Sequence, residues 1–373
     1  MFSDLPGETD LVTHKIVLGV EVPCKQKAYR CPVNLLPVVK AEIENCVRLG
    51  IIRKCQLGTK ASSFGSPIVM VKKKDQTYRM CVDFRAINKL TRTEKYLMPN
   101  MEELVAVVSR AKYLTTLDYC RGYNQIKMDE AFIPYTTFVT PFGQYSCLRL
   151  PFGLVSACAT CQVLSDLICE GCETFARSYL DDVIIFSDSW SDHVSHVKTI
   201  LSRVQETGIT LKPSKCVFAG SHVTYLGYVV GSGCVQTERL KVEAIYNFAR
   251  PVSKPDVKSL LGTVGFYKMF IPNYSTLCLP LTDMLKKDKS RNIQWSEEAQ
   301  RSFDTLRASL LSDPVLCAPD PRKPFFVQCD ASNRAVSAVL LQEDAGGVLH
   351  PCVYQSRKLQ GAETRYRPSR KKL

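Results

Sequence analysis

Two adjacent carboxylates between two apolar runs are the sharpest chemical signal in this sequence. Asp181 and Asp182 follow Ser178-Tyr179-Leu180 and precede Val183-Ile184-Ile185-Phe186, which predicts a β-hairpin with acidic residues at its turn. Charges beside apolar strands are costly unless they are neutralised, and a divalent cation would neutralise them. A tight turn can direct both carboxylates toward one ion, although the dipeptide alone also fits a solvated turn.

A third carboxylate, Asp118, ends the β-prone run from Tyr113 to Leu117. Three carboxylates at adjacent strand ends would form an oxygen-rich site suited to Mg²⁺. Two such ions, about 4 Å apart, would stabilise the attacking and leaving oxygens of a phosphoryl transfer. The spacing therefore predicts metal-dependent phosphoryl chemistry, provided that the three aspartates meet in the fold.

Two other groupings could bind a metal, and both have a simpler interpretation. The first consists of paired Cys-x-x-Cys units, namely Cys158, Cys161, Cys169 and Cys172. The spacer between the two pairs is shorter than structural zinc sites use, and the segment reads as one helix whose four thiols share a core-facing side. The second is His193 with His196, which are expected at the surface beside an apolar stripe. No Walker loop occurs, so the sequence does not support ATP-driven chemistry.

The elements that must hold these residues mix helices and strands irregularly. Apolar residues at helical spacing, followed by glycine, predict helices at 37–49 and 192–207. The β-prone runs predict strands at 66–70, 78–82, 113–117 and 224–230. The first two strands form a hairpin with a basic tip, Lys72-Lys73-Lys74. Residues 233–312 read as mostly helical and 324–342 as strand. Because regular βαβ units are missing, we predict an α+β fold with an antiparallel sheet.

The two predicted helices each have one apolar face. The face of the first helix consists of Val39, Ile43, Cys46 and Val47. The face of the second consists of Val194, Val197, Leu201 and Val204. Both faces are expected to pack against the core.

The composition is that of a globular protein with basic character. The chain has 373 residues and a formal net charge of +13, which allows two or three domains and favours polyanionic partners such as nucleic acid. Neither a long apolar run nor a secretory signal occurs, so no membrane partner is expected. We therefore expect an intracellular location, cytoplasmic or nuclear, where the 17 cysteines are mostly free thiols.

Short motifs follow one another between Val71 and Phe270, and the similarity that they indicate extends over about residues 10–366. They are Val71-Lys72-Lys73-Lys74-Asp75, Arg79-Met80-Cys81-Val82-Asp83-Phe84-Arg85, Leu117-Asp118, Gly122-Tyr123-Asn124-Gln125-Ile126, Leu150-Pro151-Phe152-Gly153, Tyr179-Leu180-Asp181-Asp182, Lys212-Pro213-Ser214-Lys215-Cys216, Tyr225-Leu226-Gly227-Tyr228 and Phe266-Tyr267-Lys268-Met269-Phe270. Each motif alone is modestly specific, but their joint order is highly specific. Together they resemble the reverse transcriptase of gypsy-type long-terminal-repeat retrotransposons.

This resemblance implies a right-hand polymerase with fingers, palm and thumb. Its palm would contain the antiparallel sheet, and an incomplete ribonuclease H-like α/β domain would follow. The predicted parts are an extended N-terminal segment with a helix at 1–59, fingers and palm at 60–232, thumb and connection at 233–315, and a truncated ribonuclease H-like domain at 316–373.

The resemblance also implies roles for single residues in the polymerase. Asp118, Asp181 and Asp182 correspond to the metal-binding aspartates, with the backbone carbonyl of Tyr119 as a further ligand. The residues implied in binding the incoming nucleotide are Lys73, Arg79, Tyr123 and Phe152. Among these, Tyr123 corresponds to the steric gate, a ring that clashes with a 2′-hydroxyl and so selects deoxynucleotides.

Two further roles concern the primer and the leaving group. Leu226-Gly227 correspond to the primer grip, a hairpin where glycine permits close backbone approach. Lys215, with Lys212 as the alternative, could protonate pyrophosphate as a general acid.

The C-terminal motifs resemble the start of a ribonuclease H domain. Asp330 corresponds to its first metal carboxylate. The next catalytic glutamate of that family lies beyond the position of Tyr366, and the sequence ends at Leu373. We therefore predict no ribonuclease H activity. Ala335 and Ser337 stand where the family usually has glycines.

The predicted function is RNA-directed DNA synthesis with two Mg²⁺ ions, for which Mn²⁺ is a possible substitute. The expected partners are an RNA or DNA template with its primer and deoxynucleoside triphosphates. One alternative is a weak or inactive retroelement relic that binds nucleic acid, favoured by Ser156, Cys158 and Cys161, where the family has asparagine, proline and phenylalanine. Another is an unrelated Mg²⁺ nuclease, which would leave the other motifs unexplained. The sequence does not predict the oligomeric state.

Overall fold

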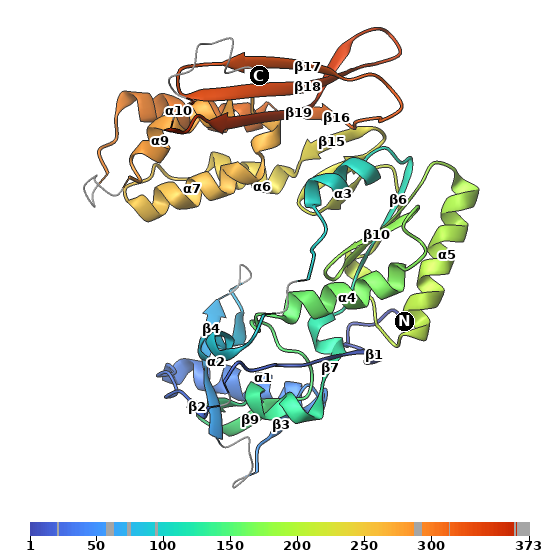
Figure 1. Cartoon of the computed structure of the whole chain (residues 1–373). Helices are drawn as coiled ribbons and strands as arrows, with labels where there is room; N and C mark the ends of the chain where they lie inside the picture. Colours follow the sequence, from blue (N-terminus) through green and yellow to red (C-terminus); the bar gives the residue numbers. More distant parts are fainter. Residues whose placement is uncertain are drawn as a thin grey trace. The chain divides into compact units, whose positions relative to one another are not determined.

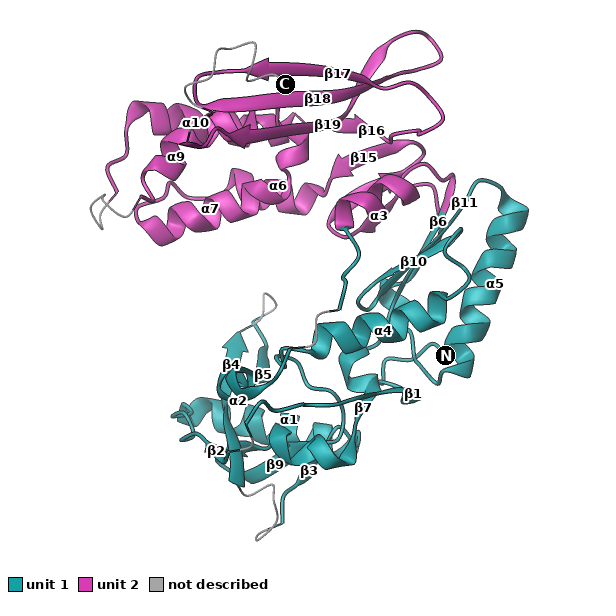
Figure 2. Cartoon of the chain, viewed as in Figure 1, with its two compact units in different colours: residues 1–100, 114–219 teal, residues 101–113, 220–373 magenta. Residues whose placement is uncertain are grey.

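The computed structural model describes residues 1–20, 22–56, 63–72, 76–93, 96–286, 293–312, 314–361 and 363. Lys73 and Lys74 of the predicted hairpin tip and the basic run from Arg367 to Lys372 lie outside the described residues. The chain divides into two compact units, coloured separately in Figure 2. Unit 1 contains residues 1–100 and 114–219, and unit 2 contains residues 101–113 and 220–373. In the described part of the chain, no helix is both long and apolar enough to cross a membrane.

A four-stranded sheet in unit 1 carries the acidic motif (Figure 1). Its strands lie in the order β10 (Ala176–Tyr179), β11 (Asp182–Ser187), β6 (Tyr113–Asp118) and β12 (Val217–Gly220). β10 and β11 are antiparallel with Tyr179 opposite Asp182, which confirms the predicted hairpin. Helix α4 (Ala157–Cys169) packs against β10, and helix α5 (Trp190–Glu206) packs against β11. These helices bury the apolar residues of β11 and so fix its acidic end.

A second sheet of unit 1 contains the predicted basic hairpin. Its strands lie in the order β2 (Cys24–Lys25), β4 (Phe64–Lys72), β8 (Phe138–Thr140), β9 (Gly143–Cys147) and β3 (Ile52–Lys54). β5 (Tyr78–Val82) pairs antiparallel with β4, which confirms the hairpin. Shorter elements complete the unit: β1 (Thr9–His14), which pairs with β7 (Ile126–Met128), and the helices η1 (Val33–Leu35), α2 (Arg85–Leu90), η3 (Gly122–Gln125), η4 (Glu130–Thr136) and η5 (Pro213–Lys215).

Helix α1 (Leu36–Arg48) confirms the helix predicted at 37–49. Val39, Ile43 and Cys46 are buried, whereas Val47 is 45% exposed, so its prediction as a core residue is wrong. At about 100° per residue, Cys46 lies about 20° from Val39 around the helix, but Val47 lies about 80° away. The buried face is therefore narrower than the predicted stripe.

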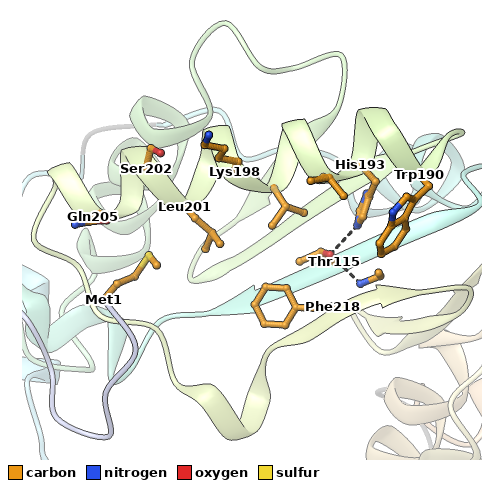
Figure 3. Close-up of a pocket in the computed structure, with 12 residues that line it drawn as sticks. Met1, Thr115, Trp190, His193, Lys198, Leu201, Ser202, Gln205 and Phe218 are labelled. Atoms are coloured by element: carbon orange, nitrogen blue, oxygen red, sulfur yellow. Dashed lines mark hydrogen bonds between the residues drawn. The ribbon is translucent and has the colours of Figure 1, made fainter.

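Helix α5 begins at Trp190, slightly before the predicted start, because the Ser189 hydroxyl caps its first turn. Val194, predicted to be in the core, is 51% exposed. It instead lines a groove of about 370 Å³, together with Leu201 of the same helix and Phe218 of β12 (Figure 3). The predicted apolar stripe is real, but Val194, Val197 and Leu201 line this groove, whereas Val204 is buried.

His193 of α5 is buried, so its prediction as a surface residue is wrong. Its Nε2 lies 2.8 Å from the Thr115 hydroxyl on β6, and its Nδ1 lies 3.0 Å from the Ser187 hydroxyl on β11 (Figure 3 shows the first contact). Burial lowers the pKa of His193 and favours the neutral ring. His196 is half-buried and stacks on Phe175 at a centroid distance of 3.9 Å. Two strand hydroxyls thus allow a histidine to replace an apolar residue in the core.

The four cysteines of the paired Cys-x-x-Cys units do not share one buried helix face as predicted. Helix α4 ends at Cys169, so Cys172 lies beyond it. Cys161, Cys169 and Cys172 are buried, but Cys158 is exposed. Cys158 lies in the first turn of α4, where its thiol contacts the hydroxyl of Tyr123 instead of the core.

Unit 2 contains a four-stranded antiparallel sheet with helix α3 (Met101–Val108) packed on it. Its strands lie in the order β13 (Val223–Tyr225), β14 (Tyr228–Gly231), β15 (Cys234–Thr237) and β16 (Val315–Cys317). The single strand predicted at 224–230 is therefore wrong. Leu226 and Gly227 have φ values of 48° and 83°, the pattern of a two-residue type I′ turn, and they fold this run into a hairpin.

The region predicted as mostly helical is confirmed, apart from β15. It contains α6 (Arg239–Tyr246), α7 (Lys254–Phe266), η6 (Lys268–Phe270), α8 (Tyr274–Leu277), α9 (Leu279–Asp283) and α10 (Glu297–Leu311). Ser253 and Asp256 form a reciprocal capping box at the start of α7, which explains why a helix begins at the proline-rich segment.

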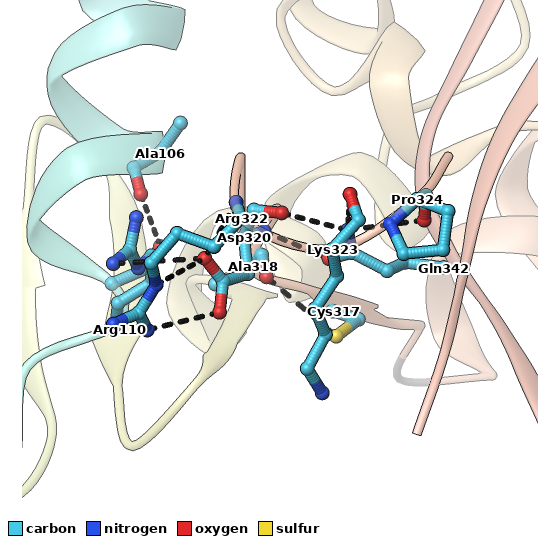
Figure 4. A network of polar contacts seen from close by, with 10 residues as sticks. Ala106, Arg110, Cys317, Ala318, Asp320, Arg322, Lys323, Pro324 and Gln342 are labelled. Atoms are coloured by element: carbon cyan, nitrogen blue, oxygen red, sulfur yellow. Dashed lines mark hydrogen bonds and ion pairs between the residues drawn. The ribbon is translucent and has the colours of Figure 1, made fainter. Parts of the chain in front are cut away.

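A three-stranded antiparallel sheet ends the described chain. Its strands lie in the order β17 (Phe326–Ala331), β18 (Ala335–Glu343) and β19 (Leu349–Lys358), which confirms the predicted strand region. The buried Gln342 amide of β18 accepts from the backbone N–H of Asp320 and donates to its carbonyl (Figure 4). The Asp320 carboxylate accepts from Arg322 and lies 3.9 Å from Arg110, which follows α3. Hydrogen bonds from Arg322 lower the pKa of Asp320 to about 2, so this network stays charged.

Candidate active site

The end of β6 lies beside the turn between β10 and β11. Asp118 is the last residue of β6, and Leu180-Asp181, here called the acidic turn, joins β10 to Asp182, the first residue of β11. The backbone N–H of Tyr119 donates to the Asp181 carbonyl at 3.3 Å. Pairing between neighbouring strands therefore brings the three aspartates, distant in sequence, into one region of unit 1.

The electrostatics of these carboxylates reflect their crowding. Burial, followed by the negative charges of Asp181 and Asp118, raises the pKa of Asp182 to about 6. The pKa of Asp181 is also raised, mainly by burial. Within the described residues, no three acidic, histidine or cysteine side chains are already arranged as ligands around one point. The raised pKa values of Asp181 and Asp182 nevertheless indicate that the carboxylates are close enough to repel one another, and their hard oxygen donors fit a divalent cation.

Lys215 provides a positive charge in this region. It is the last residue of η5, and its Nζ lies 2.7 Å from Asp118 Oδ2. This hydrogen bond raises the pKa of Lys215 and keeps it protonated. Lys212, the alternative general acid, contributes its backbone N–H, which donates to the Asp118 carbonyl at 2.9 Å. The structure therefore brings Lys215, the preferred candidate, to the aspartates.

Two side chains of α4 support the acidic turn, and sequence reasoning missed both. Leu180 has a φ of 56°, which an ordinary residue adopts only with strain. Gln162 Oε1 accepts from the Leu180 N–H at 2.8 Å, and the Ser165 hydroxyl donates to the Leu180 carbonyl at 2.5 Å. The only signal in the sequence is indirect: a two-residue turn without glycine needs external support.

Gly122 is a second residue whose importance was not predicted. A Cβ added to this glycine would lie 2.9 Å from the Cβ of Asp181 and 3.3 Å from the Cβ of Tyr119. Real Cβ atoms essentially never lie closer than 3.0 Å to another heavy atom, so the first contact would force the backbone to shift. Gly122 therefore permits the close approach of η3 to the acidic turn.

Three residues predicted to bind the nucleotide meet in one stack. The Arg79 guanidinium of β5 lies 4.3 Å from the centroid of the Phe152 ring. The Phe152 ring lies 4.8 Å from the ring of Tyr123, which belongs to η3. Asn88 of α2 supports the turn that carries Phe152, because its amide donates to the Gly153 carbonyl at 2.8 Å. The fourth predicted residue, Lys73, lies outside the described residues.

The predicted primer-grip residues, Leu226-Gly227, form the β13–β14 turn of unit 2, here called the glycine turn. The Gly227 carbonyl accepts from the Tyr267 hydroxyl at 2.9 Å. A Cβ on Gly227 would collide with Lys241 and approach Phe266 at 3.1 Å, so only glycine fits without adjustment. Asp330, the predicted ribonuclease H carboxylate, lies on β17 and is exposed.

Comparison with known proteins identifies these parts. Residues 71–230 match the family described as reverse transcriptase (RNA-dependent DNA polymerase). These residues form a reverse transcriptase domain. Residues 295–373 match the RNase H-like domain found in reverse transcriptase, so both predicted domain types are confirmed. The four domain boundaries given above remain predictions.

The relatives of this reverse transcriptase include retrotransposon Pol polyproteins of Drosophila melanogaster. It is 32% identical to the polyprotein from transposon 297 over 98% of this chain and 34% of the relative. It is 34% identical to that from transposon opus (97% and 37%) and 32% identical to that from gypsy (94% and 35%). The chain spans about a third of the length of these relatives, and the gypsy-type resemblance is confirmed.

Solved structures confirm the fold of this reverse transcriptase. The foamy viral protease-reverse transcriptase dRH in complex with double-stranded DNA matches with a TM-score of 0.87, at 23% identity, over 99% of this chain and 64% of that one. The foamy viral protease-reverse transcriptase in complex with an RNA/DNA hybrid matches with a TM-score of 0.85, at 22% identity, over 99% and 49%. The predicted right-hand polymerase fold is therefore correct.

Proposed function

We propose that this chain is an RNA-directed DNA polymerase that extends a primer on an RNA or DNA template. The primer 3′-hydroxyl loses its proton to solvent, and its oxygen forms a bond to the α-phosphorus of a deoxynucleoside triphosphate. The bond from the α-phosphorus to the β-phosphate oxygen breaks, so pyrophosphate leaves. The observation that carries the proposal is the meeting of three half-buried carboxylates where the end of β6 lies beside the acidic turn, with the Tyr119 N–H donating to the Asp181 carbonyl at 3.3 Å. Burial and the charges of Asp181 and Asp118 also raise the pKa of Asp182 to about 6, and such a group of like charges is typical of a cation-binding catalytic site.

The carboxylates fit a pair of Mg²⁺ ions, with Mn²⁺ as a substitute. Asp118, Asp181, Asp182 and the backbone carbonyl of Tyr119 are the groups that would hold them. When bound, such ions neutralise negative charge on the reacting phosphate and orient the attacking and leaving oxygens. The supporting observation is the donor set itself, since hard oxygen ligands with mutually raised pKa values are stabilised by a hard cation.

Lys215 has the role of proton donor to the leaving pyrophosphate in this proposal. Its ammonium group is held 2.7 Å from Asp118 Oδ2, and about half of its side chain is exposed. A protonated, partly mobile lysine can leave one carboxylate and reach a phosphate oxygen that gains charge. The proton on Lys215 then passes to that oxygen.

The stack of Arg79, Phe152 and Tyr123 forms one wall of the nucleotide site in this proposal. Arg79 is exposed beyond the Phe152 ring, so its charge can offset the triphosphate. Tyr123 packs on the same Phe152 ring, and its own ring excludes a 2′-hydroxyl in this proposal. Lys73 is assigned to the triphosphate by the resemblance alone.

The proposed partner is a duplex of template and primer. The formal net charge of +13 favours a polyanion, and the solved relatives bind double-stranded DNA or an RNA/DNA hybrid. The glycine turn is the proposed contact for the primer. Binding dominated by phosphate contacts weakens steeply as salt concentration rises.

Primer extension on an RNA template tests the proposal. With four deoxynucleotides and Mg²⁺, the wild-type chain should extend the primer, and Asp181→Asn should reduce the rate at least about a thousandfold. Asp188→Asn is the matched control, because Asp188 is exposed after the other end of β11, and its rate should equal that of the wild type. Extension that survives Asp181→Asn would contradict the mechanism.

The second candidate function is nucleic-acid binding without catalysis. The ion pair between Lys215 and Asp118 favours it, because it neutralises one of the carboxylates without a metal. Fluorescence anisotropy with the same primed template separates the two functions. Tight binding with no extension would support the non-catalytic alternative. The absence of ribonuclease H activity remains a prediction.

A further inference from the structure

An exposed thiol lies against the predicted gate tyrosine. Cys158, in the first turn of α4, places its Sγ 3.3 Å from the hydroxyl of Tyr123. Cys158 is exposed, whereas Tyr123 is only 8% exposed. The contact therefore lies where the surface of unit 1 meets a nearly buried ring.

The Tyr123 ring is held from two directions. On one side it packs on Phe152, at a centroid distance of 4.8 Å and an interplanar angle of 44°. On the other side its hydroxyl meets the thiol of Cys158. Burial, followed by the hydrogen bond with Cys158, raises the pKa of Tyr123, so the phenol stays protonated. The phenol is thus a neutral group that needs a hydrogen-bond partner.

The chemistry of this partner matters for the position of the ring. A thiol is a weak donor and a weak acceptor, but an unpaired hydroxyl in a nearly buried position is less favourable still. A change of χ1 that swings the Tyr123 ring away from Phe152 would move the hydroxyl away from Cys158. The thiol therefore restrains the ring in the orientation that the structure shows.

We propose that Cys158 is a positioning residue for nucleotide selection, whose thiol fixes Tyr123 and so sets how strictly the site rejects ribonucleotides. This inference rests on the proposed polymerase function. Steric rejection of a 2′-hydroxyl depends on a ring that does not yield, and a ring with freedom to tilt gives way to the extra oxygen. Cys158 acts through Tyr123 and touches no reacting atom.

The experiment compares kcat/KM for dCTP and CTP in primer extension. Cys158→Ala removes the hydrogen bond at an exposed helix position that accepts alanine readily. The ratio of kcat/KM for dCTP to that for CTP should fall about three- to tenfold, the factor that loss of one neutral hydrogen bond corresponds to. The fall should come from faster use of CTP, while kcat/KM for dCTP stays near the wild-type value. Cys158→Ser, which provides a hydroxyl as hydrogen-bond partner, should keep the wild-type ratio.

A double-mutant cycle separates positioning from general structural effects. In a Tyr123→Phe background no hydroxyl remains to be held, so adding Cys158→Ala should leave the ratio unchanged. Cys329→Ser is the control for loss of an exposed thiol, since Cys329 lies on β17 of unit 2. An unchanged ratio in an active Cys158→Ala enzyme, or an equal change in the Tyr123→Phe background, would overturn this inference alone. A wild-type chain that incorporates neither nucleotide would overturn the proposed function and this inference together.

Discussion

The acidic turn of unit 1 and the glycine turn of unit 2 are both two-residue hairpin turns, but they satisfy the backbone differently. In the glycine turn, Gly227 adopts its φ of 83° without steric cost. In the acidic turn, Leu180 has a φ of 56°, and two side chains from α4 hold it there. Leu226 of the glycine turn has a similar φ of 48°, so the two turns share this strain. They differ because a glycine follows Leu226, whereas Asp181 follows Leu180 and two α4 side chains hold that leucine.

The difference extends to charge. The acidic turn is followed by Asp182, whose pKa is raised to about 6, so the folded chain bears unfavourable charge at neutral pH. At the glycine turn, the backbone carbonyl of Gly227 is instead satisfied by the Tyr267 hydroxyl. The repulsion among neighbouring carboxylates, which sets the acidic turn apart, indicates that this turn is shaped by function. Changes at the acidic turn should therefore affect activity most, and changes at the glycine turn should affect stability.

Among changes that keep the three aspartates, the largest expected effect comes from Gly122→Ala. The new Cβ would lie 2.9 Å from the Asp181 Cβ, so the acidic turn or η3 must move. Misplacement of a reacting group by about 1 Å can reduce the rate about a hundredfold, and we expect a loss of that size in primer extension. Gly19→Ala is the matched control in unit 1, because its Cβ would meet other atoms at an ordinary 3.5 Å. Full activity of Gly122→Ala would show that the acidic turn tolerates displacement.

The elements that the sequence predicted correctly are those defined by local patterns. Alternating or helical apolar spacing identified α1, the β4–β5 hairpin and the strands around the acidic motif. The local pattern missed the glycine turn because the run from Thr224 to Val230 is β-prone on both sides of Leu226-Gly227. The family resemblance implied a hairpin there, and the backbone angles at the centre of the run show it. Local patterns therefore locate strands better than they locate the turns inside them.

The candidate site was only partly accessible from the sequence. The motif order pointed to the aspartates and to the stack of Arg79, Phe152 and Tyr123, whose members lie in separate segments. The supports were missed, since Gln162 and Gly122 act through contacts with a turn that lies far along the chain. Neither residue type signals such a contact, because glutamine and glycine occur in many structural roles.

The second prediction concerns the dependence of stability on pH. The folded pKa of Asp182, about 6, lies above the ordinary value of 3.8, so the folded state binds this proton more tightly. The resulting stabilisation is complete below about pH 4 and is lost as the pH rises through 6. Asp182→Asn should therefore be more stable than the wild type at pH 8, by about 2 kcal/mol, with little difference at pH 4. Urea denaturation at both pH values measures this.

Mg²⁺ provides the complementary control for the same residue. If the carboxylates repel one another, Mg²⁺ should raise the unfolding temperature of the wild type at pH 8 and raise it less at pH 5, where protons compete. Asp182→Asn should respond less at both pH values. If the difference in unfolding free energy between the wild type and Asp182→Asn were the same at pH 4 and pH 8, the acidic turn would not be electrostatically strained.

The smallest expected effect is the one that tests the other turn. Gly227→Ala places a Cβ at a φ of 83° and against Lys241, whose flexible side chain can move aside. The main cost is then the backbone conformation, about 1 to 2 kcal/mol of unfolding free energy in unit 2. Gly262→Ala is the control, because Gly262 lies in α7 with open space around it, and alanine should leave stability unchanged or raise it. Because the glycine turn is also the proposed primer contact, a raised KM for the primed template should accompany this loss of stability. A raised KM with stability intact would show that function alone shapes the glycine turn, and the contrast between the two turns would fail.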